Sequence, residues 1–358
     1  LKQSEKAIAS LHRAIALNPN IPEAWSNRGT ALNELKRYEE ALSDYDKALA
    51  LNPQHVEAWS NKGVSYAELK CYEEALAHYD KAIELNPDYV DAYSNRGISL
   101  QELKQFVAAV ANFDQAIALK PDYAEAYSNR GTVLMKLKRY EAEVESYDKA
   151  IALKPDYSEF YFNRGNAFKE LKQFEAALES FDKAIELKPD YPDLYLNRGA
   201  ALVQFKRPDI AIDSFFKAIS LKPDFANAYN NLGHAYSELQ KFEAAVASYD
   251  KAIEINPNDA DAYFSRGVIL NEQKRLDGLD NYRKALSINS NFPWLTGAII
   301  HGNMVLCLWE GFKTKLSDLE QKIKSGAKST VNFILLGLTD SAELQLKAAQ
   351  TWSKEFPQ

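Results

Sequence analysis

Residues 92–121 read AYSNRGISLQELKQFVAAVANFDQAIALKP, and close variants of this stretch recur along most of the chain with a spacing of 34 residues. Proline closes each copy and glycine lies near its start, at Pro19, Pro53, Pro87, Pro121, Pro155, Pro189, Pro223 and Pro257, and at Gly29, Gly63, Gly97, Gly131, Gly165, Gly199, Gly233 and Gly267. Self-similarity at a fixed period of about 20 to 50 residues is the sequence signature of a repeat architecture.

The first complete copy predicts a pair of helices. Trp25, Gly29 and Leu32 share one face of a helix because they are four and three residues apart. A short turn at Lys36–Arg37 precedes a second helix, whose apolar face is formed by Tyr38, Ala41, Tyr45 and Ala48. We expect glycine and alanine where two backbones approach closely, and aromatic rings in the wider gaps. Pro53 lacks an amide N–H, so it ends the pair and permits a fresh start.

The period and these signature residues resemble the tetratricopeptide repeat (TPR) family. The resemblance implies an all-α fold, a TPR α-solenoid in which antiparallel helix pairs stack into a right-handed superhelix with a concave inner surface. We expect residues 1–21 to form the second helix of a truncated repeat, residues 22–290 to form eight repeats of which the last is irregular, and residues 291–358 to form a helical cap or linker. Tyrosines recurring at one repeat position are predicted to pack in the core rather than to bind a cofactor; they are Tyr93, Tyr127, Tyr161, Tyr195, Tyr229 and Tyr263.

At three places the sequence departs from the repeat pattern, and each departure allows a prediction about the local structure. Glu143 occupies the position of Ala41 and Ala177. A carboxylate there is costly unless it is paired or reaches water, so we expect local adjustment. Pro208 replaces an aromatic residue at the start of a second helix, where proline is tolerated. One residue is lost around Arg275–Leu279, which ends the regular array.

Asparagine recurs at one position of the first helix in each pair, which gives the asparagine row Asn27, Asn61, Asn95, Asn129, Asn163, Asn197 and Asn231. First helices line the concave side of TPR superhelices, so we predict that this row binds peptide. An amide offers both a donor and an acceptor, and can pair with the N–H and C=O of an extended ligand. Each such bond contributes about 1 kcal/mol net. Alternatively, the row ties adjacent repeats together.

The rest of the first-helix surface is acidic, with Glu23, Glu57, Asp91 and Glu125 in one row and Glu34, Glu68 and Glu102 in another. A clamp for a terminal carboxylate needs lysine and arginine instead, which disfavours that class of TPR adaptor. We expect the cations that follow the asparagine row to form salt bridges within the array; they are Arg28, Arg96, Arg130, Arg164 and Arg198. A flanking position changes from small and polar to larger, through Ser26, Ser60, Ser94, Ser128, Phe162, Leu196, Asn230 and Phe264.

Charge, cysteine content and hydropathy limit the classes of molecule that the chain is expected to bind. The net charge of −7 disfavours nucleic acid, whose phosphates require a basic surface. Cys71 and Cys307 are too few and too far apart for a disulfide framework, which favours the cytoplasm. The N-terminal residues lack a signal-peptide pattern. The most apolar stretch, residues 294–309, is too short to span a bilayer and is predicted to be a buried helix. We therefore expect proteins or extended peptides as partners, without nucleic acid or membrane.

The last 68 residues carry a second resemblance. They predict two helices with a break near Glu310–Gly311, a C-cap at Gly326, and a final helix that Asp340 begins with Glu343 three residues later. Their signature resembles the linker of bacterial, SPINDLY-type members of the O-linked N-acetylglucosamine transferase family. The matching residues are Leu306, Cys307, Trp309, Phe312, Phe333, Leu335, Leu336, Leu338, Asp340 and Gln345; Asn332 replaces a proline of the family.

This second resemblance implies a parent glycosyltransferase that uses a UDP-sugar donor, modifies Ser or Thr of proteins, and holds peptide backbone with such an asparagine row. The catalytic region is not among these residues, so the chain itself is expected to be inactive and to hold no cofactor. Its histidines have neither metal-ligand nor triad spacing; they are His12, His55, His78, His234 and His301. One alternative is a stand-alone scaffold that assembles protein complexes, with residues 291–358 as a cap. Another is assembly into homo-oligomers through apolar patches.

Overall fold

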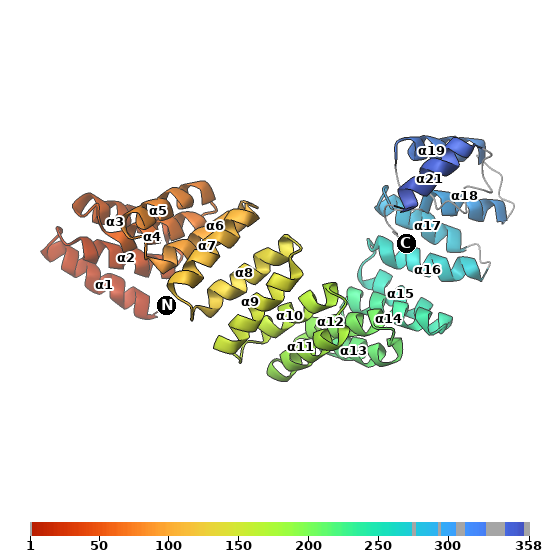
Figure 1. Ribbon diagram of the computed structural model, residues 1–358, viewed down its shortest axis with the longest axis horizontal. Helices are drawn as coiled ribbons and strands as arrows, with labels where there is room; N and C mark the ends of the chain where they lie inside the picture. The colour runs from red at the N-terminus through yellow and green to blue at the C-terminus, as the bar shows by residue number, and fades with distance from the viewer. Residues whose placement is uncertain (1, 274–276, 293–294, 306–311, 327–340, 354–358) are drawn as a thin grey trace. The chain divides into compact units, whose positions relative to one another are not determined.

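The computed structural model describes residues 2–273, 277–292, 295–305, 312–326 and 341–353, and the regular secondary structure in these ranges is entirely α-helical. The chain divides into two compact units, residues 1–188 and residues 189–358. In Figure 1 the first unit runs from red to yellow-green and the second from green to blue. Within each unit, consecutive helices pack against one another along the chain.

The first unit consists of a single helix followed by five helix pairs. Its helices are α1 (Lys2–Leu17), α2 (Pro22–Glu34), α3 (Tyr38–Leu51), α4 (Val56–Glu68), α5 (Tyr72–Leu85), α6 (Val90–Glu102), α7 (Phe106–Leu119), α8 (Ala124–Lys136), α9 (Tyr140–Leu153), α10 (Ser158–Glu170) and α11 (Phe174–Leu187). The even-numbered helices are the first helices of their pairs. Each begins where the predicted pattern begins, directly after the proline turn.

The second unit continues the pairs and then changes. Its helices are α12 (Pro192–Gln204), α13 (Pro208–Leu221), α14 (Ala226–Glu238), α15 (Phe242–Ile255), α16 (Ala260–Glu272), α17 (Asp277–Ile288), α18 (Leu295–Val305), α19 (Phe312–Lys324) and α21 (Ala342–Ser353). Pro208 is the first residue of α13, as the sequence predicts. The all-α array of TPR helix pairs is thus confirmed.

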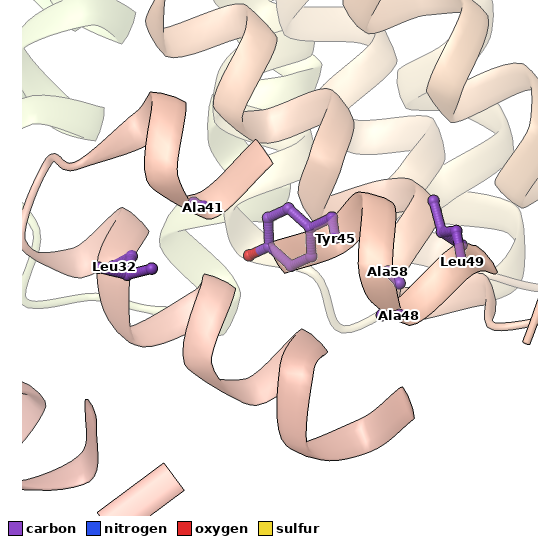
Figure 2. Close-up of a cluster of buried hydrophobic side chains, with 6 residues drawn as sticks. All are labelled: Leu32, Ala41, Tyr45, Ala48, Leu49 and Ala58. Atoms are coloured by element: carbon purple, nitrogen blue, oxygen red, sulfur yellow. The ribbon is translucent and has the colours of Figure 1, made fainter. Parts of the chain in front are cut away.

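Each pair is held together by an aromatic ring lying on a glycine. Tyr45 is 0% exposed, and Figure 2 shows its ring in a cluster with Leu32, Ala41, Ala48, Leu49 and Ala58. A Cβ atom on Gly29 would lie 2.8 Å from Cε1 of Tyr45, so the first helix must carry glycine here. The same contact joins Gly63 to Tyr79, Gly97 to Phe113, Gly131 to Tyr147, Gly165 to Phe181, Gly199 to Phe215, Gly233 to Tyr249 and Gly267 to Tyr282.

The turn within each pair contains a residue in the left-handed region. Lys36 has a φ of 59°. Its N–H donates to the Asn33 carbonyl, and the next N–H, of Arg37, donates to the Leu32 carbonyl, both at 2.9 Å. This is the Schellman motif, which usually carries glycine. The same conformation recurs at Lys70, Lys104, Lys138, Lys172, Lys206 and Gln240. The sequence places the turn at Lys36–Arg37, but nothing in a lysine predicts a positive φ.

Successive repeats pack mainly where the second helix of one repeat meets the first helix of the next, and their first helices also contact one another. In the first unit α2 contacts α4, α4 contacts α6, α6 contacts α8 and α8 contacts α10; in the second, α12 contacts α14 and α14 contacts α16. Within the parts that the structure describes, successive second helices make no comparable contact with one another. Within each unit, first helices therefore lie on the inner side of the stack.

Among the residues that the structure describes, three helices follow the last pair: α18, α19 and α21. Ile300 of α18, Leu319 and Ile323 of α19, and Leu344 of α21 form a buried cluster. Gly326 has a φ of +81°, which fits the predicted C-cap after α19. The Oγ of Ser341 accepts the N–H of Leu344 at 3.4 Å at the start of α21.

Much of the second resemblance falls outside the described residues. The residues of that signature that lie outside are Leu306, Cys307, Trp309, Glu310–Gly311, Asn332, Phe333, Leu335, Leu336, Leu338 and Asp340. The shortening of the repeat near Arg275 also falls on residues outside the described ranges. Phe312 begins α19 and Gln345 lies in α21. Within the apolar stretch 294–309, Leu295, Ile299 and Ile300 of α18 are buried, in agreement with a buried helix.

Candidate peptide-binding face

The asparagine row occupies one register of the first helices. In the first unit Asn27, Asn61, Asn95, Asn129 and Asn163 lie on α2, α4, α6, α8 and α10, and in the second unit Asn197 and Asn231 lie on α12 and α14. Asn27 is exposed and the other six are half-buried. Because the first helices of each unit contact one another, the structure groups five of these amides in one unit and two in the other.

One amide of the row links two repeats. The Asn61 amide nitrogen donates to Oγ1 of Thr30, on the preceding first helix, at 3.2 Å. That hydroxyl lies 3.3 Å from the hydroxyl of Tyr45. Burial raises the pKa of Tyr45 to about 12, so the phenol remains protonated at neutral pH and the group is a hydrogen-bonding one. At this position the alternative predicted role, tying neighbouring repeats together, is met.

A related arrangement surrounds Asn163. The hydroxyls of Thr132 and Tyr147 lie 3.1 Å apart in the preceding repeat. Burial raises the pKa of Tyr147, and hydrogen bonds from Thr132 and Asn163 oppose that increase. Asn163 therefore also faces a hydroxyl of its neighbour.

In the second unit two amides turn back onto their own helices. The Asn197 amide nitrogen donates to the Asp193 carbonyl and that of Asn231 to the Asn227 carbonyl, each at 2.9 Å. Both carbonyls lie four residues earlier in the same helix, where they already accept the helical N–H. Such a bond can be exchanged for a ligand without leaving a buried group unsatisfied.

Asn95 and Asn129 differ again. Their side chains make no hydrogen bond to any residue that the structure describes, and neither has a buried unsatisfied atom. The residues of the preceding first helices that correspond to Thr30 are Val64 and Ile98, which have no hydroxyl to offer. The amides of Asn95 and Asn129, on half-buried residues, thus keep their hydrogen-bonding capacity available.

The position that precedes the asparagine row, occupied by Ser26 in the first pair, does not form the exposed surface of changing side-chain size that the sequence predicts. Ser26, Ser60 and Ser94 are 3%, 1% and 2% exposed. The residue before the next first helix covers this position: Tyr89 hydrogen-bonds Ser60, and its burial raises its pKa to about 12. The larger residues further along pack inward too, since Phe162 lies 6.1 Å from Phe181 between ring centroids. The position therefore contributes to packing, between repeats at Ser60 and within one repeat at Phe162.

Carboxylates border the row. The side chains of Glu57 and Glu125 are 60% and 51% exposed. Glu125 pairs with Lys154, which together with other groups lowers the pKa of the carboxyl. Glu68 accepts the Tyr38 hydroxyl at 3.0 Å, from the second helix of the preceding repeat. The face is therefore polar and acidic, as expected.

The cations beside the row form the predicted salt bridges. Arg130 contacts Asp114, on the second helix of the preceding repeat, at 2.6 Å, and donates to Ser146 in its own repeat at 2.7 Å. Equivalent pairs join Arg96 to Asp80, Arg164 to Asp148, Arg266 to Asp250 and Lys62 to Asp46. Arg28 instead pairs with Asp44, and Arg198 donates to Ser214.

The aspartates of these bridges were not identified from the sequence, although a signal for them exists. Aspartate recurs 16 residues before the cation, and at one joint both partners change together, to Phe216 and Leu232. Leu232 is 3% exposed, so an apolar residue replaces the arginine where the aspartate is lost.

No helix among the described residues is long and apolar enough to cross a membrane. Tetratricopeptide repeat models match residues 22–55, 56–89, 94–158, 146–179, 226–259 and 248–278, and a TPR repeat model matches residues 165–204 and 209–240. No curated protein matches the sequence.

Solved structures give the following likenesses. YrrB, described as a TPR protein with an unusual peptide-binding site, is 26% identical over 55% of this chain and 97% of its own, with a TM-score of 0.46. A MamA fragment from Desulfovibrio magneticus RS-1 is 24% identical over 48% of this chain and 96% of its own, with a TM-score of 0.46. The APC/C hetero-tetramer Cut9–Hcn1 is 17% identical over 78% of this chain and 55% of its own; its TM-score of 0.51 supports the fold alone.

Proposed function

Because the chain belongs to the tetratricopeptide repeat family and is a protein-interaction module, we propose that the asparagine row of its first helices binds extended polypeptide. The observation that carries this proposal is the position of Asn95 and Asn129. They lie on successive first helices that contact each other, with side-chain amides that bond no described residue. These amides can pair with a ligand without first breaking a bond within the array.

The spacing of the row suits an extended chain. Packed helices lie about 8–10 Å apart, and an extended peptide rises about 3.3 Å per residue. One amide would therefore meet about every third residue of the ligand. Each bond adds about 1 kcal/mol net, so a few of them give weak binding that depends little on the ligand's side chains. The bordering carboxylates, such as Glu57 and Glu125, disfavour ligands with a dense negative charge.

A double substitution tests the proposal. The Asn95→Ala/Asn129→Ala variant should bind a peptide selected by display on the wild-type chain about tenfold or more weakly, since two bonds of about 1 kcal/mol are lost. Fluorescence polarisation with the labelled peptide measures this, and the thermal midpoint should change by less than about 2 °C.

The matched control changes exposed residues on second helices, Gln115→Ala, Lys149→Ala and Glu179→Ala, and should bind like the wild type. An Asn95→Ala/Asn129→Ala variant with wild-type affinity would contradict the proposal. A parallel loss of affinity and thermal stability would show that the row serves only the packing of repeats.

A finer proposal concerns the protein that this module serves. We propose that it guides polypeptide to an O-linked N-acetylglucosamine transferase-like enzyme, with UDP-sugar as donor. The support is the sequence signature around residues 306–345, of which Phe312 and Gln345 lie in described helices. The full-length protein should transfer N-acetylglucosamine from UDP-N-acetylglucosamine to a peptide bound by the row. Peptide binding without any UDP-sugar turnover would instead favour the stand-alone scaffold.

A further inference from the structure

Glu143 occupies a position built for a methyl group. It lies on α9 and is 1% exposed. The corresponding residue in the six other regular pairs is Ala41, Ala75, Ala109, Ala177, Ala211 or Ala245, each 0% exposed. In those repeats the site is an apolar contact between neighbouring helices. The fourth complete pair, α8–α9, places a carboxyl group there instead.

This carboxyl group has no partner. Both of its oxygens are buried, and neither makes a hydrogen bond. A buried charge without a partner is strongly disfavoured, so the group favours its neutral form. Burial first, and then the nearby Glu170 of α10, raise the pKa of Glu143 to about 7.

The ionisable groups on the packed helices do not neutralise it. They are Glu125, Tyr127, Arg130 and Lys136 on α8, Glu159, Tyr161, Arg164, Lys169 and Glu170 on α10, and Tyr140, Glu141, Glu145, Tyr147, Asp148 and Lys149 on α9 itself. Arg130 and Arg164 pair with Asp114 and Asp148. Lys169 donates to Asn166 at 3.4 Å, and its pKa is lowered by desolvation. Tyr147 is buried beside Glu143, and the negative charge of Glu143 further raises its pKa.

We infer that ionisation of Glu143 loosens the packing of α9 against α8 and α10, which makes this repeat a pH-responsive joint within the first unit. When the helix opens, water reaches the carboxylate, so the open state is favoured once the group is charged. The pKa of Glu143 is about 7 in the packed state and returns toward 4.5 when the group is solvated. Packing is therefore fully stabilised below pH 4.5, loses stability as the pH rises from 4.5 to 7, and stays at the lower level above pH 7.

The joint lies within the asparagine row, since α8 carries Asn129 and α10 carries Asn163. If the proposed function holds, on which this consequence rests, peptides that span both residues should bind more weakly above pH 7. The joint itself is tested without any ligand, so its failure and the failure of peptide binding are distinguishable.

Amide hydrogen exchange of the wild-type chain measures the opening. Protection of α9 is followed from pH 5 to pH 8 and corrected for the intrinsic exchange rate at each pH. The opening equilibrium should rise on the order of 50-fold over this range, because the group is ionised more readily in the open state. The equivalent alanine-containing helix α11 serves as an internal reference and should show no comparable rise.

Glu143→Ala restores the residue of the other repeats, so it should fold and should abolish the rise. Glu143→Gln keeps the size of the side chain without its titration and should also give a flat profile. Glu145→Ala removes an exposed carboxylate from the same helix and should keep the wild-type profile. A wild-type opening equilibrium that does not rise with pH would overturn the inference. Pairing of Lys169 with the carboxylate would give that result. A rise that persists in Glu143→Ala would also overturn the inference.

Discussion

The asparagine row is engaged differently in the two units of the chain. In the first unit Asn61 donates to Thr30 on the preceding first helix. In the second, Asn231 donates to a carbonyl of its own helix, and the residue corresponding to Thr30 is Ala200. The Asn61 amide thus joins two repeats where the preceding helix offers a hydroxyl, and the Asn231 amide folds back onto its own helix. Where Val64 and Ile98 stand in place of the hydroxyl, the amides of Asn95 and Asn129 do neither. One residue type at one repeat position serves packing in some repeats and is available for recognition in others.

Gly131→Ala is the change expected to have the largest effect, because it would disrupt the contact that holds the two helices of one pair in the first unit together. A Cβ atom there would lie 2.9 Å from the buried ring of Tyr147, the ring whose hydroxyl meets Thr132. Overpacking of this kind costs about 1–3 kcal/mol. Thermal unfolding followed by circular dichroism should show a midpoint lowered by several degrees. An unchanged midpoint would mean that the ring can move, against its complete burial.

Thr30→Ala tests the difference between the two units more specifically, and we expect it to lower the stability less than Gly131→Ala does. It removes the acceptor of the Asn61 amide, so the first unit should lose about 0.5–1.5 kcal/mol of stability in urea unfolding. Ala200→Thr is the reciprocal change, and it should draw the Asn231 amide away from its own helix. The Asn231→Ala substitution should alter stability by less than about 0.5 kcal/mol. A larger loss from Asn231→Ala than from Thr30→Ala would refute the distinction between the two units.

Lys104→Gly and Gln240→Gly probe a feature that the two units share. Both residues adopt a positive φ, at 59° and 57°, which glycine adopts without steric penalty. The penalty for other residues is about 1–2 kcal/mol, partly offset by the greater freedom of glycine in the unfolded chain. Each variant should therefore gain up to about 1 kcal/mol, and by similar amounts in the two units. A loss of stability in either variant would show that the lysine or glutamine side chain contributes more than its backbone conformation costs.

The sequence predicts the fold well because the same packing residues recur in each repeat. The glycine–aromatic contact appears as a 16-residue spacing in most pairs, and the helices begin after each proline turn. The left-handed lysines could not be predicted, because lysine has no preference for that conformation; the packing of the two helices imposes it. The burial of Ser60 could not be predicted either, since it depends on Tyr89 of the following repeat folding over it.

For the candidate site, the sequence identifies the asparagine row but not the state of each amide. That state depends on the neighbouring first helix, 31 residues earlier in the case of Asn61 and Thr30. The cost of Glu143 was evident from its alanine counterparts. Its lack of any partner required the arrangement of α8, α9 and α10 around it.

The most direct test of the recognition claim observes the amides themselves. In a nitrogen-15 spectrum of the wild-type chain, the side-chain NH2 signals of the row can be assigned by single substitution and followed as a selected peptide is added. The signals of Asn95 and Asn129 should shift in a saturable manner, and further than the signal of Asn61. Peptide binding that leaves both signals unmoved while shifting residues of the second helices would contradict the account.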